Sequence, residues 1–173
     1  TNSGYIKRIS VDEYRIQKRG GKGLKGAANR EEDFVSKIFA ADTLTQILCI
    51  SNLGKMYWLK VHRIPQGSRT SKGKAIANVL NLANGEIIQT FLPVQEFDPE
   101  KYIWFVTEKG IIKKTSLEKF SRPRPSGLIA LSIDDDDNLM GARIGAENDN
   151  IFLSTAQGMS IRFEDAKVRP MGR

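Results

Sequence analysis

The chain has little cysteine, little histidine and no long hydrophobic run. Its 173 residues include one cysteine and one histidine, so neither a disulfide framework nor a cysteine-rich zinc site can form within it. No apolar run approaches the ~20 residues that cross a bilayer. A membrane span is therefore not expected. The first residues are polar, so a signal peptide is not expected either. The chain also begins without a methionine, and we expect it to be cut from a longer one.

The usual motifs of catalysis and cofactor binding are also missing. Residues 21–26 fit the pattern GxGxxG, but charged residues precede them where a dinucleotide site needs a buried strand. The acidic residues 134–137 lack the spacing of a calcium loop and are interpreted as a turn between strands. His62 lies among cations, and Cys49 lies in an apolar run where core packing is expected. The sequence therefore predicts a chain without a catalytic site, a metal site or a cofactor.

What the chain does contain is a repeat. Residues 47–64, 103–120 and 151–168 align without gaps, and each begins with a short apolar run. Each has a hydroxyl residue at its fifth place and a glycine at its eighth. A fourth, partial copy opens the chain, and the four glycines are spaced 50, 56 and 48 residues apart. A period near 50 in a β-rich pattern is typical of propeller blades. These glycines are Gly4, Gly54, Gly110 and Gly158.

Within a unit, the apolar run at residues 103–106 predicts a strand covered on both faces, and the glycine that follows predicts a hairpin turn. A second strand pair is predicted in each unit: 33–39 with 45–50, 75–82 with 87–94, and 128–133 with 139–144. Residues 31–41 have a composition compatible with a short helix, but the repeat favours a strand. The fold class is therefore all-β. We predict a β-pinwheel or propeller-like repeat of four-stranded blades, about three blades plus the start of a fourth. The units are placed at about 4–53, 54–109, 110–157 and 158–173, as part of a larger ring.

Charge follows the same period. The chain carries a net +7, and four windows hold nearly all the cations: residues 1–30, 54–74, 110–124 and 158–173, with net charges of +6, +6, +4 and +2. Each window covers the strand after the glycine and the loop beyond it. Stacked units place equivalent parts on one edge, which predicts a basic rim. Such a rim suits the phosphate backbone of bent duplex DNA, without readout of sequence.

Residues 17–23 read Gln-Lys-Arg-Gly-Gly-Lys-Gly. The glycines allow their backbone N–H groups to come close to an anion, and the neighbouring cations add positive charge. This stretch resembles the glycine-rich box that marks the C-terminal domain of bacterial DNA gyrase A, with Lys18 where arginine is usual. Residues 4–8, 33–35, 52–55, 72–73 and 168–173 are similar to that family too. The resemblance implies a β-pinwheel in which neighbouring blades exchange strands, and which wraps DNA around its basic perimeter.

The function that the resemblance implies is a non-catalytic DNA-wrapping module that supports negative supercoiling. The parent would be an ATP-dependent type IIA topoisomerase, assembled with gyrase B as a heterotetramer in the bacterial cytoplasm, at the nucleoid. Two alternatives remain open: the related C-terminal domain of topoisomerase IV, in which the box is degenerate or missing, and a propeller that binds an acidic protein. The candidate DNA-binding residues are Gln17, Lys18, Arg19, Gly20, Gly21, Lys22 and Gly23 in the box, and Lys7, Arg8, Lys55, Lys60, Arg63, Arg69, Lys72, Lys74, Lys113, Lys114, Lys119, Arg122, Arg124, Arg162 and Arg169 on the rim.

Overall fold

The structure is a computed structural model that describes residues 1–14, 19–21 and 33–173. Within these residues the regular elements are β-strands and short 3-10 helices, with no α-helix. This confirms the all-β prediction. In chain order the elements are β1 (Tyr5–Ile6), η1 (Val11–Glu13), β2 (Gln46–Ser51), β3 (Lys55–Lys60), η2 (Val61–Arg63), β4 (Lys74–Ala75), η3 (Ile76–Asn78), β5 (Ile88–Val94), β6 (Lys101–Thr107), β7 (Ile112–Ser116), η4 (Leu117–Phe120), β8 (Leu128–Ile129), β9 (Leu139–Ala146), β10 (Asn150–Ser154), β11 (Ser160–Glu164) and η5 (Asp165–Lys167).

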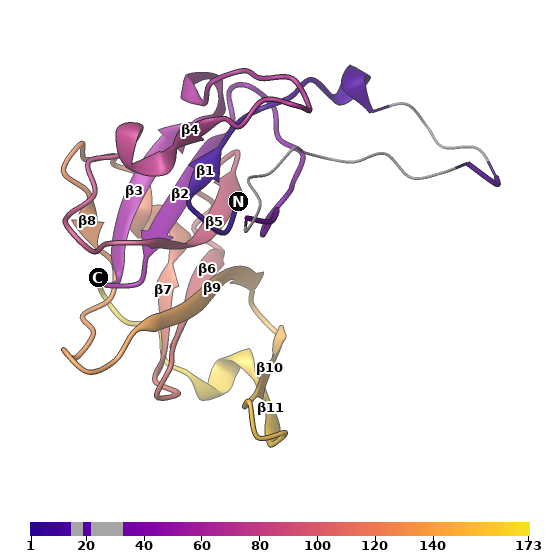
Figure 1. The fold of residues 1–173 in the computed structure, drawn as a ribbon. Helices are drawn as coiled ribbons and strands as arrows, with labels where there is room; N and C mark the ends of the chain where they lie inside the picture. Colours follow the sequence, from indigo (N-terminus) through magenta and orange to yellow (C-terminus); the bar gives the residue numbers. More distant parts are fainter. Residues whose placement is uncertain (15–18, 22–32) are drawn as a thin grey trace.

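The strands form several small antiparallel sheets that lie side by side (Figure 1). One sheet has the order β5-β2-β3-β8, and its neighbour has the order β7-β6-β9. Strand β8 follows η4 in the chain, yet it pairs with β3 of the preceding unit, and β4 pairs with β1 in the same way. Neighbouring units thus exchange strands, as the resemblance implies. The unit boundaries themselves remain a prediction.

Four turns share one geometry, and three of them join the paired strands of a hairpin: β2 with β3, β6 with β7, and β10 with β11. Each turn glycine has a left-handed φ between +74° and +86°, a conformation that glycine adopts at little cost. In every turn a hydroxyl oxygen accepts a hydrogen bond of 3.1 to 3.3 Å from the backbone N–H four residues later. The repeated hydroxyl and glycine of the sequence are therefore the two residues that close the turn. The hydroxyl residues are Thr1, Ser51, Thr107 and Thr155.

A carboxylate lies beneath each of the first three turns. Asp33 accepts hydrogen bonds from two backbone N–H groups, and Asp137 does the same in the third unit. In the second unit Glu86 instead accepts from the Ala83 N–H at 2.8 Å and from the Tyr57 hydroxyl at 2.7 Å, and it meets the turn through the Ser51 hydroxyl. Burial works to raise the pKa of Glu86, but the hydrogen bonds from Ala83, Tyr57 and Ser51 outweigh it and hold the pKa below its usual range.

The hydrophobic core lies between neighbouring units, and β2 separates its two halves. Leu48 and Ile50 face the cluster that contains β6, whereas Ile47 and Cys49 face the cluster that contains η3 and, at its margin, Ile6 of β1. All four side chains are at most 1% exposed, so this strand is covered on both faces, as its continuous apolar run predicted. Burial also raises the pKa of the Cys49 thiol, which favours the neutral core residue expected from the sequence.

In each of the three predicted second strand pairs, the structure confirms one strand. Strands β5 and β9 confirm the predictions at 87–94 and 139–144, and β2 confirms the one at 45–50. The prediction at 75–82 was wrong beyond Ala75, because Ile76 and Leu80 are buried four residues apart and the N–H of Leu80 bonds to the Ile76 carbonyl. The prediction at 128–133 was wrong beyond Ile129, since the next two N–H groups turn toward the Gly54 carbonyl. Residues 33–39 form no strand, and no described strand pairs with them.

The turn geometry predicts different costs for alanine at two equivalent glycines. A Cβ at Gly54 would overlap the Leu131 carbonyl oxygen, whereas a Cβ at Gly158 would meet nothing within 4 Å. Gly158→Ala is expected to cost about 1 kcal/mol, for the left-handed conformation alone. Gly54→Ala is expected to cost about 2 kcal/mol more, for the overlap with backbone. Urea unfolding of both variants measures the difference, and equal costs would contradict the contact between the two units.

The carboxylate beneath the second turn predicts a pH-dependent stability. Because the pKa of Glu86 is lowered in the folded state, its contribution is present above the ordinary pKa of about 4.3 and is lost as the pH falls through the folded value. Burial and the adjacent carboxylate raise the pKa of Tyr57, so stability should also fall as the pH rises above about 10. Glu86→Gln should lower stability by about 1 to 3 kcal/mol at pH 7, and by less as the pH falls below about 4.3. Thermal unfolding across pH tests this, with the exposed Glu118→Gln as control; a pH-independent difference would contradict it.

Candidate nucleic-acid interface

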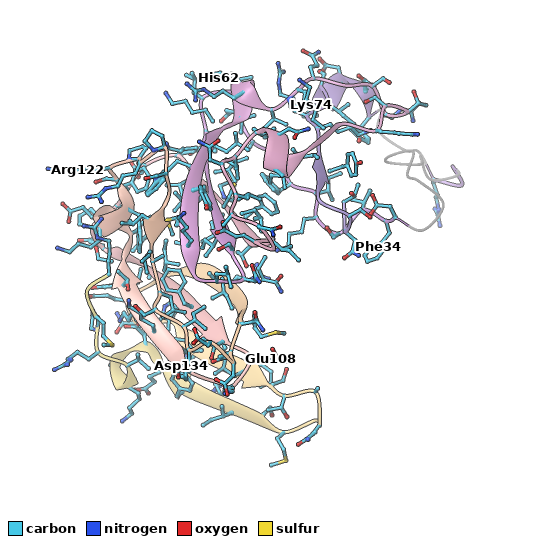
Figure 2. All side chains as sticks on the ribbon, turned by 60° about the vertical axis from the view of Figure 1, so that its left-hand side comes forward. Phe34, His62, Lys74, Glu108, Arg122 and Asp134 are labelled. Carbon is cyan, nitrogen blue, oxygen red and sulfur yellow. The ribbon has the colours of Figure 1, made fainter. Side chains whose placement is uncertain are left out.

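Each hairpin places its turn at one end of its sheet and a 3-10 helix at the other. The helices η1, η2, η4 and η5 each begin seven residues after the turn glycine. Because the units repeat, these helices and the loops after them gather along one edge. We call this the helical edge and define it as residues 11–14, 61–74, 117–127 and 165–173. The opposite turn edge comprises residues 51–54, 107–110, 134–138 and 155–158. In Figure 2, His62, Lys74 and Arg122 lie on the upper side of the molecule, and Glu108 and Asp134 on the lower side.

Most of the predicted cations are exposed to solvent. Ten of them have exposed side chains, and within the described residues none of the ten forms an ion pair. Lys55 and Arg69 are half-buried, and the Lys55 ammonium lies 5.2 Å from the centre of the Tyr57 ring. The exposed cations carry unneutralised charge that a polyanion can meet. They are Arg19, Lys60, Arg63, Lys72, Lys74, Lys119, Arg122, Arg124, Arg162 and Arg169.

Three of the predicted DNA-binding cations instead donate hydrogen bonds to backbone carbonyl oxygens. The Lys7 ammonium donates to three carbonyl oxygens of the loop after η2, at 2.7 to 3.0 Å. Arg8 donates to the Ile64 carbonyl at 2.9 Å, and Lys113 donates to the Ala130 carbonyl at 3.1 Å. Burial lowers the pKa of Lys7, against the opposing effect of Glu13, and burial also lowers the pKa of Lys113. Lys7 and Arg8 hold the loop after η2, and all three ammonium donors of Lys7 are engaged.

Lys114 does not belong to the exposed set, and its assignment as a DNA contact was wrong. Its side chain lies in the interior, where it forms an ion pair with Asp165 of η5. The ammonium also lies 4.2 Å from the centre of the Tyr102 ring. A buried lysine requires a partner of opposite charge. The sequence could not show the pairing, because Asp165 lies far along the chain from Lys114.

The glycine-rich box is described only in part. Arg19, Gly20 and Gly21 are exposed, and Gly20 has a left-handed φ of +79°. The remaining predicted box residues, Gln17, Lys18, Lys22 and Gly23, lie outside the described residues.

The helical edge contains two exposed cations that the sequence prediction missed, Lys167 and Arg173. Lys167 lies nine residues after its turn glycine, the same place as Arg63 in η2 and Lys119 in η4. Counting from the turn glycine is the signal that finds it. With Lys167 included, three successive units present a cation within their first helix, before the loop.

The turn edge carries the opposite charge. Residues 134–137 form the predicted acidic turn, closed by a 3.0 Å hydrogen bond from the Asp137 N–H to the Asp134 carbonyl. Asp136 pairs with Lys109, and Glu108 is exposed beside them. In the third unit, acids therefore gather at the turn edge and cations at the helical edge, so a polyanion is attracted to the helical end of this unit and repelled from its turn. Residues 11–14 of the helical edge carry two acids and no cation.

The described residues contain neither a group of metal ligands nor a membrane-spanning helix. Across the part of the chain that the structure describes, no three cysteine, histidine, aspartate or glutamate side chains are grouped so that they could hold a metal ion. None of the described helices has the length and apolar character needed to span a bilayer.

Comparison with known sequences finds one family. A family model described as the DNA gyrase C-terminal domain, beta-propeller, matches residues 1–42, 45–95, 101–145 and 149–173. The DNA gyrase A protein of Clostridium acetobutylicum is 44% identical over 173 residues, covering 100% of this chain and 21% of that protein. The DNA gyrase A protein of Haemophilus influenzae is 42% identical over 173 residues, covering 100% of this chain and 20% of that protein. The chain thus spans about a fifth of the length of these curated relatives.

Comparison with solved structures finds similar folds. The C-terminal domain of DNA topoisomerase IV superposes with a TM-score of 0.80 and 26% identity, covering 98% of this chain and 51% of that chain. The DNA gyrase A C-terminal domain superposes with a TM-score of 0.76 and 26% identity, covering 99% of this chain and 55% of that chain.

Proposed function

Because the chain belongs to the DNA gyrase C-terminal domain family of β-propellers, we propose that it binds duplex DNA and bends it along the helical edge. The observation that carries this proposal is the repeated array of exposed cations at that edge, set against the acids of the turn edge. The recurrence of Arg63, Lys119 and Lys167 at one place in three successive units supports this proposal beyond a basic composition alone.

The cations would act on phosphates and would leave the bases unread. Lysine and arginine that contact phosphate release condensed counterions, and this supplies affinity that depends on salt and not on sequence. Arg63, Lys119 and Lys167 offer one such contact in each of three successive units. Bending 20–30 base pairs costs about 1 to 6 kcal/mol, which additional phosphate contacts along a curved edge can offset.

The glycine-rich box would anchor one end of the bent duplex. Its glycines permit close approach of the backbone, and its cations add positive charge to exposed Arg19. In the parent protein this module would present DNA for strand passage and support negative supercoiling. Strand cleavage and ATP turnover would reside in other domains and in a gyrase B partner, within the bacterial cytoplasm at the nucleoid.

A second candidate is the corresponding module of a topoisomerase IV. It is favoured by the similarity of the fold to the topoisomerase IV domain. The near-complete box at residues 17–23 and the gyrase A relatives at 42–44% identity favour the gyrase role.

The DNA-binding edge predicts unequal effects for two lysines of equal charge. Lys119→Ala removes a cation from the helical edge, and Lys109→Ala removes one from the turn edge. If Lys119 contacts a phosphate, its loss should reduce the magnitude of the log–log salt slope of binding by about 0.9, whereas loss of Lys109 should leave the slope unchanged. The measurement is the fluorescence anisotropy of a duplex of ~40 base pairs across a salt series.

Two outcomes would count against the proposed edge. Equal effects of the two substitutions would mean that net charge alone drives binding. Absence of binding to duplex at low salt, together with binding to an acidic polypeptide such as polyglutamate, would favour a protein partner in place of DNA.

A further inference from the structure

The residue four places after the turn glycine reaches into the next unit. In the first unit Arg8 donates to the Ile64 carbonyl at 2.9 Å, and in the second Trp58 donates to the Phe120 carbonyl at 2.8 Å. Both carbonyls belong to the residue three places after the start of the next unit's 3-10 helix. Two different side chains therefore make the same connection between neighbouring units.

The third unit makes this connection with an ion pair. Lys114 holds the equivalent place, and its ammonium lies 2.5 Å from a carboxylate oxygen of Asp165, the first residue of η5. Val61 and Leu117 occupy the equivalent first places of η2 and η4, where both are buried apolar residues. The fourth unit thus replaces an apolar contact with a charged one.

The surroundings of this pair are closed to solvent. Lys114 is 3% exposed and Asp165 is 4% exposed. The Lys114 ammonium also lies 4.2 Å from the ring centre of Tyr102 and 5.3 Å from that of Trp104. A backbone hydrogen bond of 2.8 Å from the Met171 N–H to the Lys114 carbonyl lies beside it. A buried pair of this kind is little screened by salt, and either charge alone would be left uncompensated.

The position of the pair links it to the helical edge. Asp165 begins the helix that ends at Lys167, and Arg169 follows two residues later. Both are exposed cations of the proposed DNA-binding edge. Because Lys114 holds the start of this helix, it fixes where the two cations lie relative to those of the preceding unit.

We propose that Lys114 and Asp165 are positioning residues, which hold η5 against the third unit so that Lys167 and Arg169 continue the line of phosphate contacts. This inference rests on the proposed function. It gives Lys114, which is buried away from the exposed cations, a part in binding that acts through its neighbours.

The test compares loss of one charge with replacement of both. Asp165→Asn keeps the shape of the side chain but removes its charge, and Lys114→Met with Asp165→Leu restores the apolar contact of the other units. Asp165→Asn is expected to lower Tm by roughly 10 °C, as for a buried charge left unpaired. Below that Tm it should reduce the magnitude of the salt slope of duplex binding by about 2, because two phosphate contacts are lost. The double variant should recover both Tm and slope.

A DNA-independent measurement separates this inference from the proposed function. Hydrogen exchange of the Met171 amide reports whether the segment after η5 stays docked on Lys114, and it should be faster in the folded Asp165→Asn chain and normal in the double variant. Unchanged exchange would overturn the inference, whether or not the chain binds DNA. Faster exchange with an unchanged salt slope, in a chain that binds DNA, would also overturn it. A wild-type chain that binds no DNA would instead refute the proposed function.

Discussion

The hairpin turn is the constraint on which the rest of the structure depends. A left-handed glycine and a hydroxyl that caps the N–H four residues later recur in all four units. The turn glycine sets the positions of the later elements of its unit. The 3-10 helix begins seven residues after the glycine, and the side chain that joins the next unit lies four residues after it. Because these spacings from the turn glycine are constant, equivalent residues lie at equivalent places in each unit.

The distribution of charge follows from this repeated spacing. Carboxylates lie beside two of the turns, where Asp33 and Asp137 accept hydrogen bonds from turn N–H groups that would otherwise be left unsatisfied. In the second, third and fourth units the other end carries exposed cations. The third unit thus carries acids at its turn and cations at its other end. The exchange of β4 and β8 between units holds the cations of neighbouring units in a fixed relation.

Much of the fold could be predicted from the sequence, because the signals are local. The glycine at +74° to +86° needs a residue without Cβ, and the buried strand β2 needs a continuous apolar run, so both are visible in the chain. The helical turn at η3 could have been found from the spacing of Ile76 and Leu80. The unpaired segment at 33–39 could not, since a strand needs a partner, and no described strand pairs with these residues.

The candidate site was predictable as a pattern and less so residue by residue. Lys119 and Lys114 look alike in the sequence, yet one is exposed and the other is buried against Asp165. Lys7 looks like a surface cation, yet its three donors are taken by carbonyls of a loop some 60 residues away. A charge in the sequence gives the sign of an interaction but not its partner. Lys167, by contrast, could have been found by counting from the turn glycine.

The central claim is that the helical edge bends duplex DNA along itself, and the most direct test measures that bend. A duplex of ~40 base pairs with a donor and an acceptor dye at its two ends should show increased energy transfer when the chain saturates it, and the increase should disappear at high salt. Saturation by anisotropy with unchanged energy transfer would contradict the claim, because the chain would then bind a straight duplex.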